Sequence, residues 1–212
     1  MTNRSEKRVV AIPLTRVQFL ADVIFATSMT IMVLNFDLPG DNEIGSESDL
    51  LKYFADQRDA LLTYVISFLL VFIYWMKHLE HFSHIKETSS GHVWLQAGFL
   101  MFLMIIPVGN NLYSTWPENP RAATFYCFVV LMVGLFSFLS WRYATKDHRL
   151  VDDDLDEELI KDLKRETLVE PAAALIAILA IWFVNPDLVE PIFLLLPILY
   201  AFRAKFRRKK SA

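Results

Sequence analysis

Long apolar segments alternate with shorter charged segments along this chain. Roughly 20 apolar residues in a helix cover the hydrocarbon core of a bilayer, and six segments approach that length. They are residues 16–36, 60–76, 92–113, 122–143, 168–184 and 188–202. The last two are short and are joined by Asn185-Pro186, which predicts a tight antiparallel hairpin. The pattern therefore predicts an all-α membrane protein with six transmembrane helices, forming a single domain over residues 1–212.

Two charged segments between the spans have helical patterns of their own. Residues 37–59 begin with a Pro-Gly break and are acidic, and Ser46 or Ser48 is placed to cap a short amphipathic helix. Residues 146–166 carry leucines at four-residue spacing after the acidic run at residues 152–154. That combination predicts an amphipathic linker helix whose first turn is favoured by the acidic residues.

Composition and charge distribution support a membrane protein with a defined orientation. The chain is 54% hydrophobic with a mean hydropathy of +0.34, too apolar for a soluble domain of 212 residues. One set of loops and both termini carry most of the basic residues: Arg4, Lys7, Arg8, Arg16, Lys77, Lys86, Arg142, Lys146, Arg149, Lys161, Lys164, Arg165, Arg203, Lys205, Arg207, Arg208, Lys209 and Lys210. The other side has only Lys52, Arg58 and Arg121. The positive-inside rule therefore predicts that both termini are cytoplasmic, and the basic tail suits anionic lipid.

The first span carries an aliphatic stripe and an acidic residue. At about 100° per residue one face of a helix collects a row of mostly aliphatic positions. These are Leu20, Ile24, Thr27, Ile31 and Leu34. Asp22 lies roughly opposite Thr27, where an ionised carboxylate costs at least about 2.5 kcal/mol unless neighbouring helices offset it. The stripe has two interpretations, helix packing or lipid contact on one hand and a pore wall with hydrophobic constrictions on the other. Periodicity does not choose between them.

Polar side chains at the end of the second span are the natural partners of Asp22. His78 is expected at the same depth, so that a charge-assisted hydrogen bond would satisfy both groups, with Trp75 and Gln96 as further donors. A different interpretation takes His78, His81 and His84 as metal ligands. Their spacing sweeps about 120° of a straight helix, which is loose for one metal ion.

These residues resemble a known family. Arg16-x-x-x-Leu20-Ala21-Asp22 is similar to the Arg-x-x-x-Phe-Ser-Asp signature that opens the first helix of the endolysosomal potassium channel family, transmembrane protein 175. Trp75, His78 and Phe82 match its Trp-x-x-His-x-x-x-Phe motif, Gln96 and Pro107 resemble its third helix, and Trp141–Tyr143 also fits. The polar residues Arg16, Asp22, Trp75, His78 and Gln96 would then form a structural network.

The resemblance implies a prokaryotic member with one six-helix repeat per subunit, located in the cell membrane. It implies a homotetramer whose first helix lines a central pore, with Leu20 and Ile24 along the wall and a constriction at Thr27, Ile31 and Leu34. It implies no P-loop filter, no cofactor, no enzymatic activity and no nucleic-acid partner, and K⁺ as a weakly preferred permeant ion. Thr27 departs from the aliphatic residue expected there, which would wet the pore and leave Ile31 and Leu34 as the hydrophobic gate.

Two other functions are compatible with the residues alone. A membrane-embedded metal or haem enzyme would use His78, His81 and His84. A proton-coupled transporter would use Asp22 and His78, although the chain shows no inverted repeat or paired broken helices.

Overall fold

The computed structural model describes residues 12–36, 39 and 45–210, with side chains as far as residue 202. The predicted acidic loop residues Asp37, Asp41 and Glu43, the basic residues before Ile12 and the side chains of the basic tail lie outside this description. The elements in chain order are α1 (Leu14–Ile31), the 3-10 turn η1 (Met32–Asn35), α2 (Glu47–Asp56), α3 (Arg58–His84), α4 (Ser90–Thr115), α5 (Pro120–Thr145), η2 (Lys146–His148), α6 (Glu157–Glu166), α7 (Val169–Phe183), η3 (Pro186–Leu188) and α8 (Val189–Lys210).

The all-helical prediction is confirmed, and each predicted span falls on a helix. Five described segments are long and apolar enough to cross a membrane: Leu14–Asn35, Arg58–His84, Ser90–Thr115, Pro120–His148 and Glu157–Phe183. The helix α3 continues past the predicted end of the second span at residue 76 as far as His84. The polar residues beyond 76 include Lys77, His78 and His81, which are buried among neighbouring helices and so do not end the helix.

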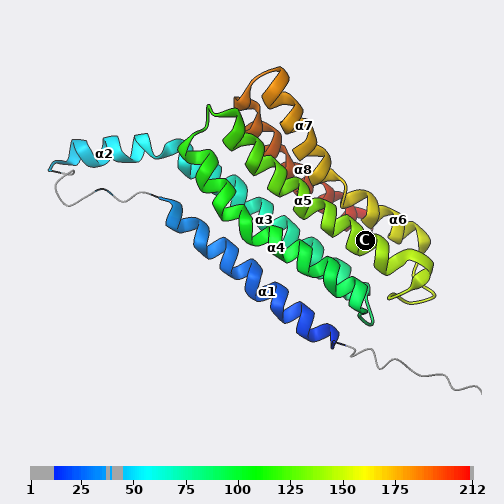
Figure 1. The fold of residues 1–212 in the computed structure, drawn as a ribbon. Coiled ribbons are helices and arrows are strands. Elements are labelled where there is room, and N and C mark those ends of the chain that lie inside the picture. Colours follow the sequence, from blue (N-terminus) through cyan, green and yellow to red (C-terminus); the bar gives the residue numbers. More distant parts are fainter. Residues whose placement is uncertain (1–11, 37–38, 40–44, 211–212) are drawn as a thin grey trace, which may run out of the picture.

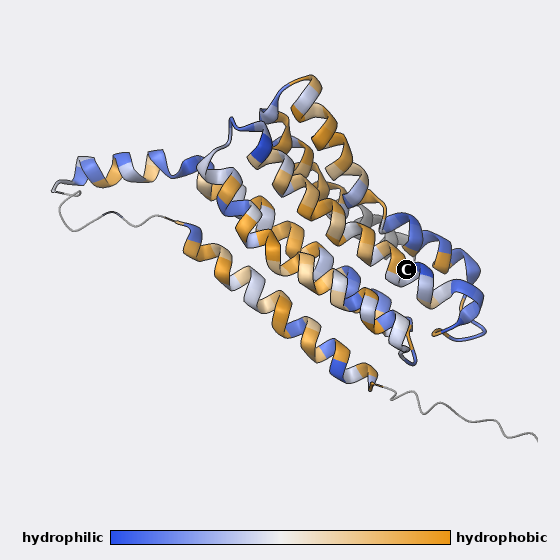
Figure 2. Ribbon diagram, viewed as in Figure 1, coloured by the Kyte–Doolittle hydropathy of each residue, from blue (hydrophilic) through white to orange (hydrophobic). Residues whose placement is uncertain are grey.

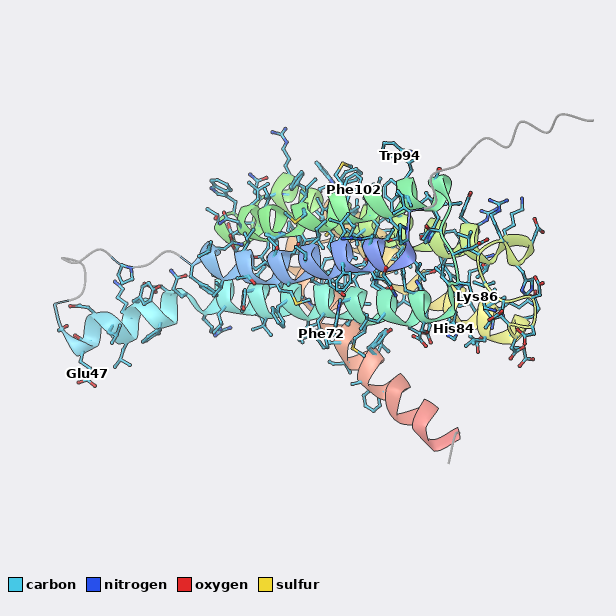
Figure 3. The ribbon with its side chains drawn as sticks, turned by 90° about the horizontal axis from the view of Figure 1, so that it is seen from below. Glu47, Phe72, His84, Lys86, Trp94 and Phe102 are labelled. Carbon is cyan, nitrogen blue, oxygen red and sulfur yellow. The ribbon has the colours of Figure 1, made fainter. Side chains whose placement is uncertain are left out.

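The helices form a layered bundle with α1 on one edge (Figure 1). Contacts join α1 to α3 and α4, α4 to α5, and α5 to α7, while α8 packs on α3 and α7. Seen from below, α1 lies across the junction of α3 and α4 (Figure 3). The start of α1 and the end of α8 point toward the same end of the bundle (Figure 1).

Small residues allow two of these contacts to be close. A Cβ at Gly98 of α4 would lie 2.4 Å from the Phe136 ring of α5, and one at Gly134 of α5 would lie 2.6 Å from Pro171 of α7. Glycine at such positions lets neighbouring helices approach where lipid provides no hydrophobic driving force. The α4–α5–α7 layer is therefore the tightly packed part of the fold.

The two amphipathic helices are the hydrophilic elements of the molecule (Figure 2). Ser46 caps α2 as predicted, because its hydroxyl accepts from the Asp49 amide at 3.3 Å. The linker helix α6 begins later than predicted, since Asp156 rather than the acidic run at 152–154 accepts from the Glu158 amide at 3.0 Å. Asn185 caps the short turn η3, so the tight connection between α7 and α8 is also confirmed.

Candidate functional site

One face of α1 packs against the rest of the chain. Its buried residues follow a spacing of three or four and are Val17, Ala21, Phe25, Ser28 and Met32. The Phe25 ring lies 5.8 Å from Phe99 of α4 and 5.6 Å from the ring of His78 on α3. This face holds α1 onto both helices, while much of the opposite side of α1 is exposed.

The predicted stripe lies on the uncovered side. Leu20, Ile31 and Leu34 are 54%, 39% and 77% exposed, and Ile24 and Thr27 are partly buried. Both interpretations of the stripe, lipid contact and a pore wall, require such exposure. The described part of the chain leaves Leu20, Ile31 and Leu34 where lipid, water or another protein can reach them.

Two threonines on α1 have their hydroxyl hydrogens directed into the helix. Thr27 Oγ1 donates to the Val23 carbonyl, and Thr30 Oγ1 donates to the Ala26 carbonyl, both at 2.7 Å. A hydroxyl that donates to its own backbone still has oxygen lone pairs to offer. Each threonine therefore presents a hydrogen-bond acceptor to its surroundings.

Asp22 is held by Trp75 rather than by His78. The indole Nε1 of Trp75 donates to Asp22 Oδ1 at 3.0 Å. Among the described residues no hydrogen bond joins Asp22 to His78, so the expected direct pair is not formed. The reason is the His78 ring, which stacks on Phe82 at 4.2 Å and turns toward Gln96 on α4.

The remaining predicted polar residues divide between a buried network and the surface. His78 Nε2 donates to Gln96 Oε1 at 3.3 Å, and Gln96 Nε2 donates to Ser140 Oγ of α5 at 2.7 Å. His92 Nδ1 is buried with no partner among the described residues. Arg16 is exposed and forms no ion pair within the described chain. The network thus links α3, α4 and α5, while Asp22 and Arg16 lie apart from it.

The three histidines of α3 do not converge on a common point. His81 stacks on Trp141 at 4.6 Å, and His84 lies edge-on to the same ring at 6.4 Å, whereas His78 faces Gln96. The described residues contain no group of three or more His, Cys, Asp or Glu side chains placed to hold a metal ion. Within the described residues, the metal-enzyme interpretation therefore has no set of side chains that could bind the metal.

A second polar network, not anticipated from the sequence, fixes the other end of α1. Asn35 Nδ2 donates to the Pro107 carbonyl at 3.1 Å and to Asn110 Oδ1 at 3.0 Å. Asn110 is 1% exposed, and its Nδ2 donates to the Thr63 carbonyl at 3.1 Å and to Ser67 Oγ at 2.8 Å. Asn110 therefore ties η1, which directly follows α1, to α3 and α4.

A buried ion pair was also missed. Lys77 Nζ lies 2.5 Å from Glu170 Oε2, and both side chains are 2% exposed. The same ammonium donates to the Glu166 carbonyl at 2.6 Å. Lys77 had been counted among the cytoplasmic basic residues, but it lies inside the bundle and joins α3 to α7. A glutamate in an otherwise apolar span was the available signal.

Comparison with known proteins extends the likeness across the fold. Residues 16–107 match the family model described as the endosomal/lysosomal potassium channel TMEM175. A potassium channel of Chamaesiphon minutus is 23% identical over 89% of this chain and 94% of its own length. A potassium channel of Streptomyces collinus is 25% identical over 66% of this chain and 69% of its own length.

The solved structures show the same arrangement of helices. The crystal structure of a TMEM175 homologue from Chamaesiphon minutus superposes with a TM-score of 0.76 and 21% identity, covering 90% of this chain and 97% of that chain. The named relatives are ion channels rather than enzymes, and no cofactor is expected for such a channel. Residues 16–107, which include the motif residues Arg16, Asp22, Trp75 and His78, match the TMEM175 family model, so the predicted resemblance to this family is confirmed.

Proposed function

We propose that this chain forms a potassium-permeable cation channel, in which four copies surround a pore lined by α1. Each subunit would span the plasma membrane of a prokaryote six times, with both termini in the cytoplasm. The observation that carries the proposal is the exposed face of α1 and the following turn η1, where Leu20 is 54% and Leu34 is 77% exposed. The likeness to named potassium channels supports K⁺ as the permeant ion.

The constriction in this proposal has a polar ring, which water can hydrate, and an apolar part, which excludes water. Thr27 offers oxygen lone pairs, because its hydroxyl hydrogen is bonded to Val23. Ile31 and Leu34 offer only hydrocarbon, and a ring of such side chains gates by excluding water. Leu20 and Ile24 line the wall before the constriction. With no carbonyl cage to replace the hydration shell, preference for K⁺ over Na⁺ is weak and conduction is passive.

The polar residues near α1 support the pore rather than conduct. Trp75 and Gln96 satisfy Asp22 and His78 from outside the proposed pore wall. Arg16 belongs to the same predicted network but is exposed at the start of α1. The α8 helix continues to Lys210, and the proposal includes binding of anionic lipid by its basic tail.

The test is potassium flux in liposomes with an imposed K⁺ gradient and valinomycin as the control for loading. Ile31→Asn is expected to raise flux by roughly tenfold, because an amide wets the constriction. Ile176→Asn is the matched control, since Ile176 is a 57% exposed isoleucine on α7, and it should conduct like the wild type.

Two results would count against the proposal. Equal changes in both variants would mean that the substitution acts on folding or insertion rather than on a pore. A folded wild-type protein that passes no K⁺ would contradict the channel itself.

A further inference from the structure

A pocket with a basic mouth lies between α4 and α5, away from α1. Its volume is about 300 Å³, and it is lined by Leu95, Leu139, Arg142, Tyr143, Lys146 and Arg149. The lining contains three cations, one aromatic ring and two leucines, and no carboxylate. We propose that this pocket binds an anionic phospholipid, with the phosphate held by the three cations and an acyl chain lying along the leucines.

The positive charge of the pocket is not neutralised within the described chain. Three other basic residues at this end pair with carboxylates: Lys86 with Asp152, Lys161 with Glu157, and Arg165 with Asp162. None of the three pocket cations forms an ion pair with a described residue. Arginine binds phosphate through parallel charge-assisted hydrogen bonds. A phosphate group from outside the chain would therefore supply the counter-charge that the three pocket cations lack.

The pocket is a built feature because its side chains are positioned by specific contacts. The Arg149 guanidinium lies 4.4 Å above the Tyr143 ring. The Tyr143 hydroxyl accepts from Ser89 Oγ at 3.0 Å. Gly91 makes room for that ring, since a Cβ there would lie 2.7 Å from the hydroxyl oxygen. Tyr143 and Arg149 are therefore fixed from α4 before any ligand binds.

An unusual turn brings Arg149 back toward the end of α5. Asp147 and His148 both have positive φ, 56° and 50°. Residues other than glycine adopt such backbone angles at a cost in conformational free energy. His148 Nδ1 donates to the Asp152 carbonyl at 2.7 Å, and the Leu150 amide donates to the Ala144 carbonyl at 3.0 Å. These bonds hold the reversal that places Arg149 in the same pocket as Arg142 and Lys146.

The position of the pocket along the membrane normal favours a lipid over a free ion as its ligand. The α4 and α5 helices have 26 residues each, and a helix of that length extends beyond the hydrocarbon core of about 30 Å. The pocket lies near their ends, at the level of headgroups. Trp94, 78% exposed, projects from α4 beside Leu95 (Figure 3), as expected for an aromatic residue at the interface. The two leucines of the lining can contact an acyl chain but offer no hydrogen bond or charge to a free phosphate ion.

The experiment measures lipid retained by the full-length purified protein. Native mass spectrometry is used to titrate dioleoyl phosphatidylglycerol against dioleoyl phosphatidylcholine, and inorganic phosphate is tested by thermal shift. The pocket variant is Arg142→Gln/Lys146→Gln/Arg149→Gln. The matched control removes three cations from α6 at the same end: Lys161→Gln/Lys164→Gln/Arg165→Gln. Both variants keep the basic tail, so its diffuse attraction for lipid is unchanged.

The pocket variant is expected to bind phosphatidylglycerol at least about tenfold more weakly, because each basic residue near a membrane surface contributes a substantial part of the attraction. The α6 control should stay within about twofold of the wild type. Phosphate alone should not shift the melting temperature. Leu139→Trp fills the apolar part without removing charge, and it should weaken phosphatidylglycerol binding even if the triple variant does not fold.

Three outcomes overturn the proposal. Equal losses in the pocket and α6 variants would mean that only net charge matters. Stabilisation of the wild type by inorganic phosphate, abolished in the pocket variant, would identify an ion site instead of a lipid site. Unchanged phosphatidylglycerol binding by a folded Leu139→Trp protein would remove the acyl chain from the pocket.

Discussion

The outer faces of α1 and α7 are both uncovered, but their chemistry differs. The exposed residues of α7 are all apolar: Ala172, Leu175, Ile176, Leu179, Trp182 and Phe183. The exposed residues of α1 include Arg16, Asp22 and Thr30 among aliphatic side chains. An apolar face alone suits lipid, whereas a face with ionisable and hydroxyl groups indicates contact with water or protein. Exposure alone therefore does not distinguish a lipid-facing helix from a pore helix, and the polar residues of α1 are the feature that sets it apart from α7.

The two helices are also anchored differently. A buried ion pair from Lys77 to Glu170 ties α7 to α3. Past the C-terminal end of α1, Asn35 is held by the Asn110 network; nearer the start of α1, Trp75 donates to Asp22 and Thr88 Oγ1 donates to the Ile12 carbonyl. We expect α7 to be a fixed support and α1 to have most freedom near Asp22.

The largest expected effect is on the α7 anchor. Glu170→Gln should lower the free energy of unfolding by about 3–5 kcal/mol, because it leaves the Lys77 ammonium buried without its counter-charge. The check is unfolding in mixed detergent micelles followed by tryptophan fluorescence. Lys77→Met/Glu170→Leu should restore most of the lost stability, and failure to do so would mean that the pair is needed for more than neutralisation.

The second prediction concerns the better-held end of α1. Asn110→Leu should lower the free energy of unfolding by about 2–3 kcal/mol, since it strips partners from Asn35, Ser67 and the Thr63 carbonyl. The neighbouring Asn111→Leu is the control, because its side chain makes one exposed bond to Asn35. The same unfolding assay applies, and equal losses from the two variants would refute a special role for Asn110.

The third prediction separates the two threonines of α1. In the proposed pore, Thr27→Val should reduce potassium flux by roughly tenfold, equivalent to about 1.4 kcal/mol for lost hydration at the constriction. Thr30→Val should leave flux unchanged, because Thr30 lies outside the predicted stripe. Liposome flux at matched protein content gives the comparison. A larger loss of flux in Thr30→Val than in Thr27→Val would mean that the side of α1 carrying Thr30 faces the pore.

The smallest expected effect is at the weakly held end of α1. Asp22→Asn should change the free energy of unfolding by less than about 1 kcal/mol, because the amide oxygen still accepts from Trp75. Unfolding of Asp22→Asn beside Trp75→Phe measures it. A loss as large as that of Asn110→Leu would show that this end is not the looser of the two.

Periodicity and capping were sufficient to predict most of the fold. The apolar segments, the Ser46 cap and the tight turn at Asn185 are local features, which depend on residues close together in sequence. The stripe on α1 was also visible locally, as the exposure of Leu20 and Leu34 shows. These local patterns do not predict which side chain, distant in sequence, each polar group contacts.

Apart from the later start of α6, the differences from the sequence predictions concern such distant partners. Asn35 and Asn110 are 75 positions apart, and Lys77 and Glu170 are 93 apart. A lysine after an apolar run is expected in water, and only the path of α7 brings a glutamate to it. Similarly, Asp22 has two plausible partners one helical turn apart on α3, and the stacking of His78 on Phe82 decides between them.

The bond from Thr27 to its own backbone has a consequence for the sign of the field in the proposed pore. Because the hydroxyl hydrogen points into the helix, a ring of such groups presents the negative ends of its dipoles to passing ions. A ring of this kind repels anions without carrying an ionisable group. Discrimination against chloride at that level should therefore remain the same across the whole range of pH in which the protein is folded.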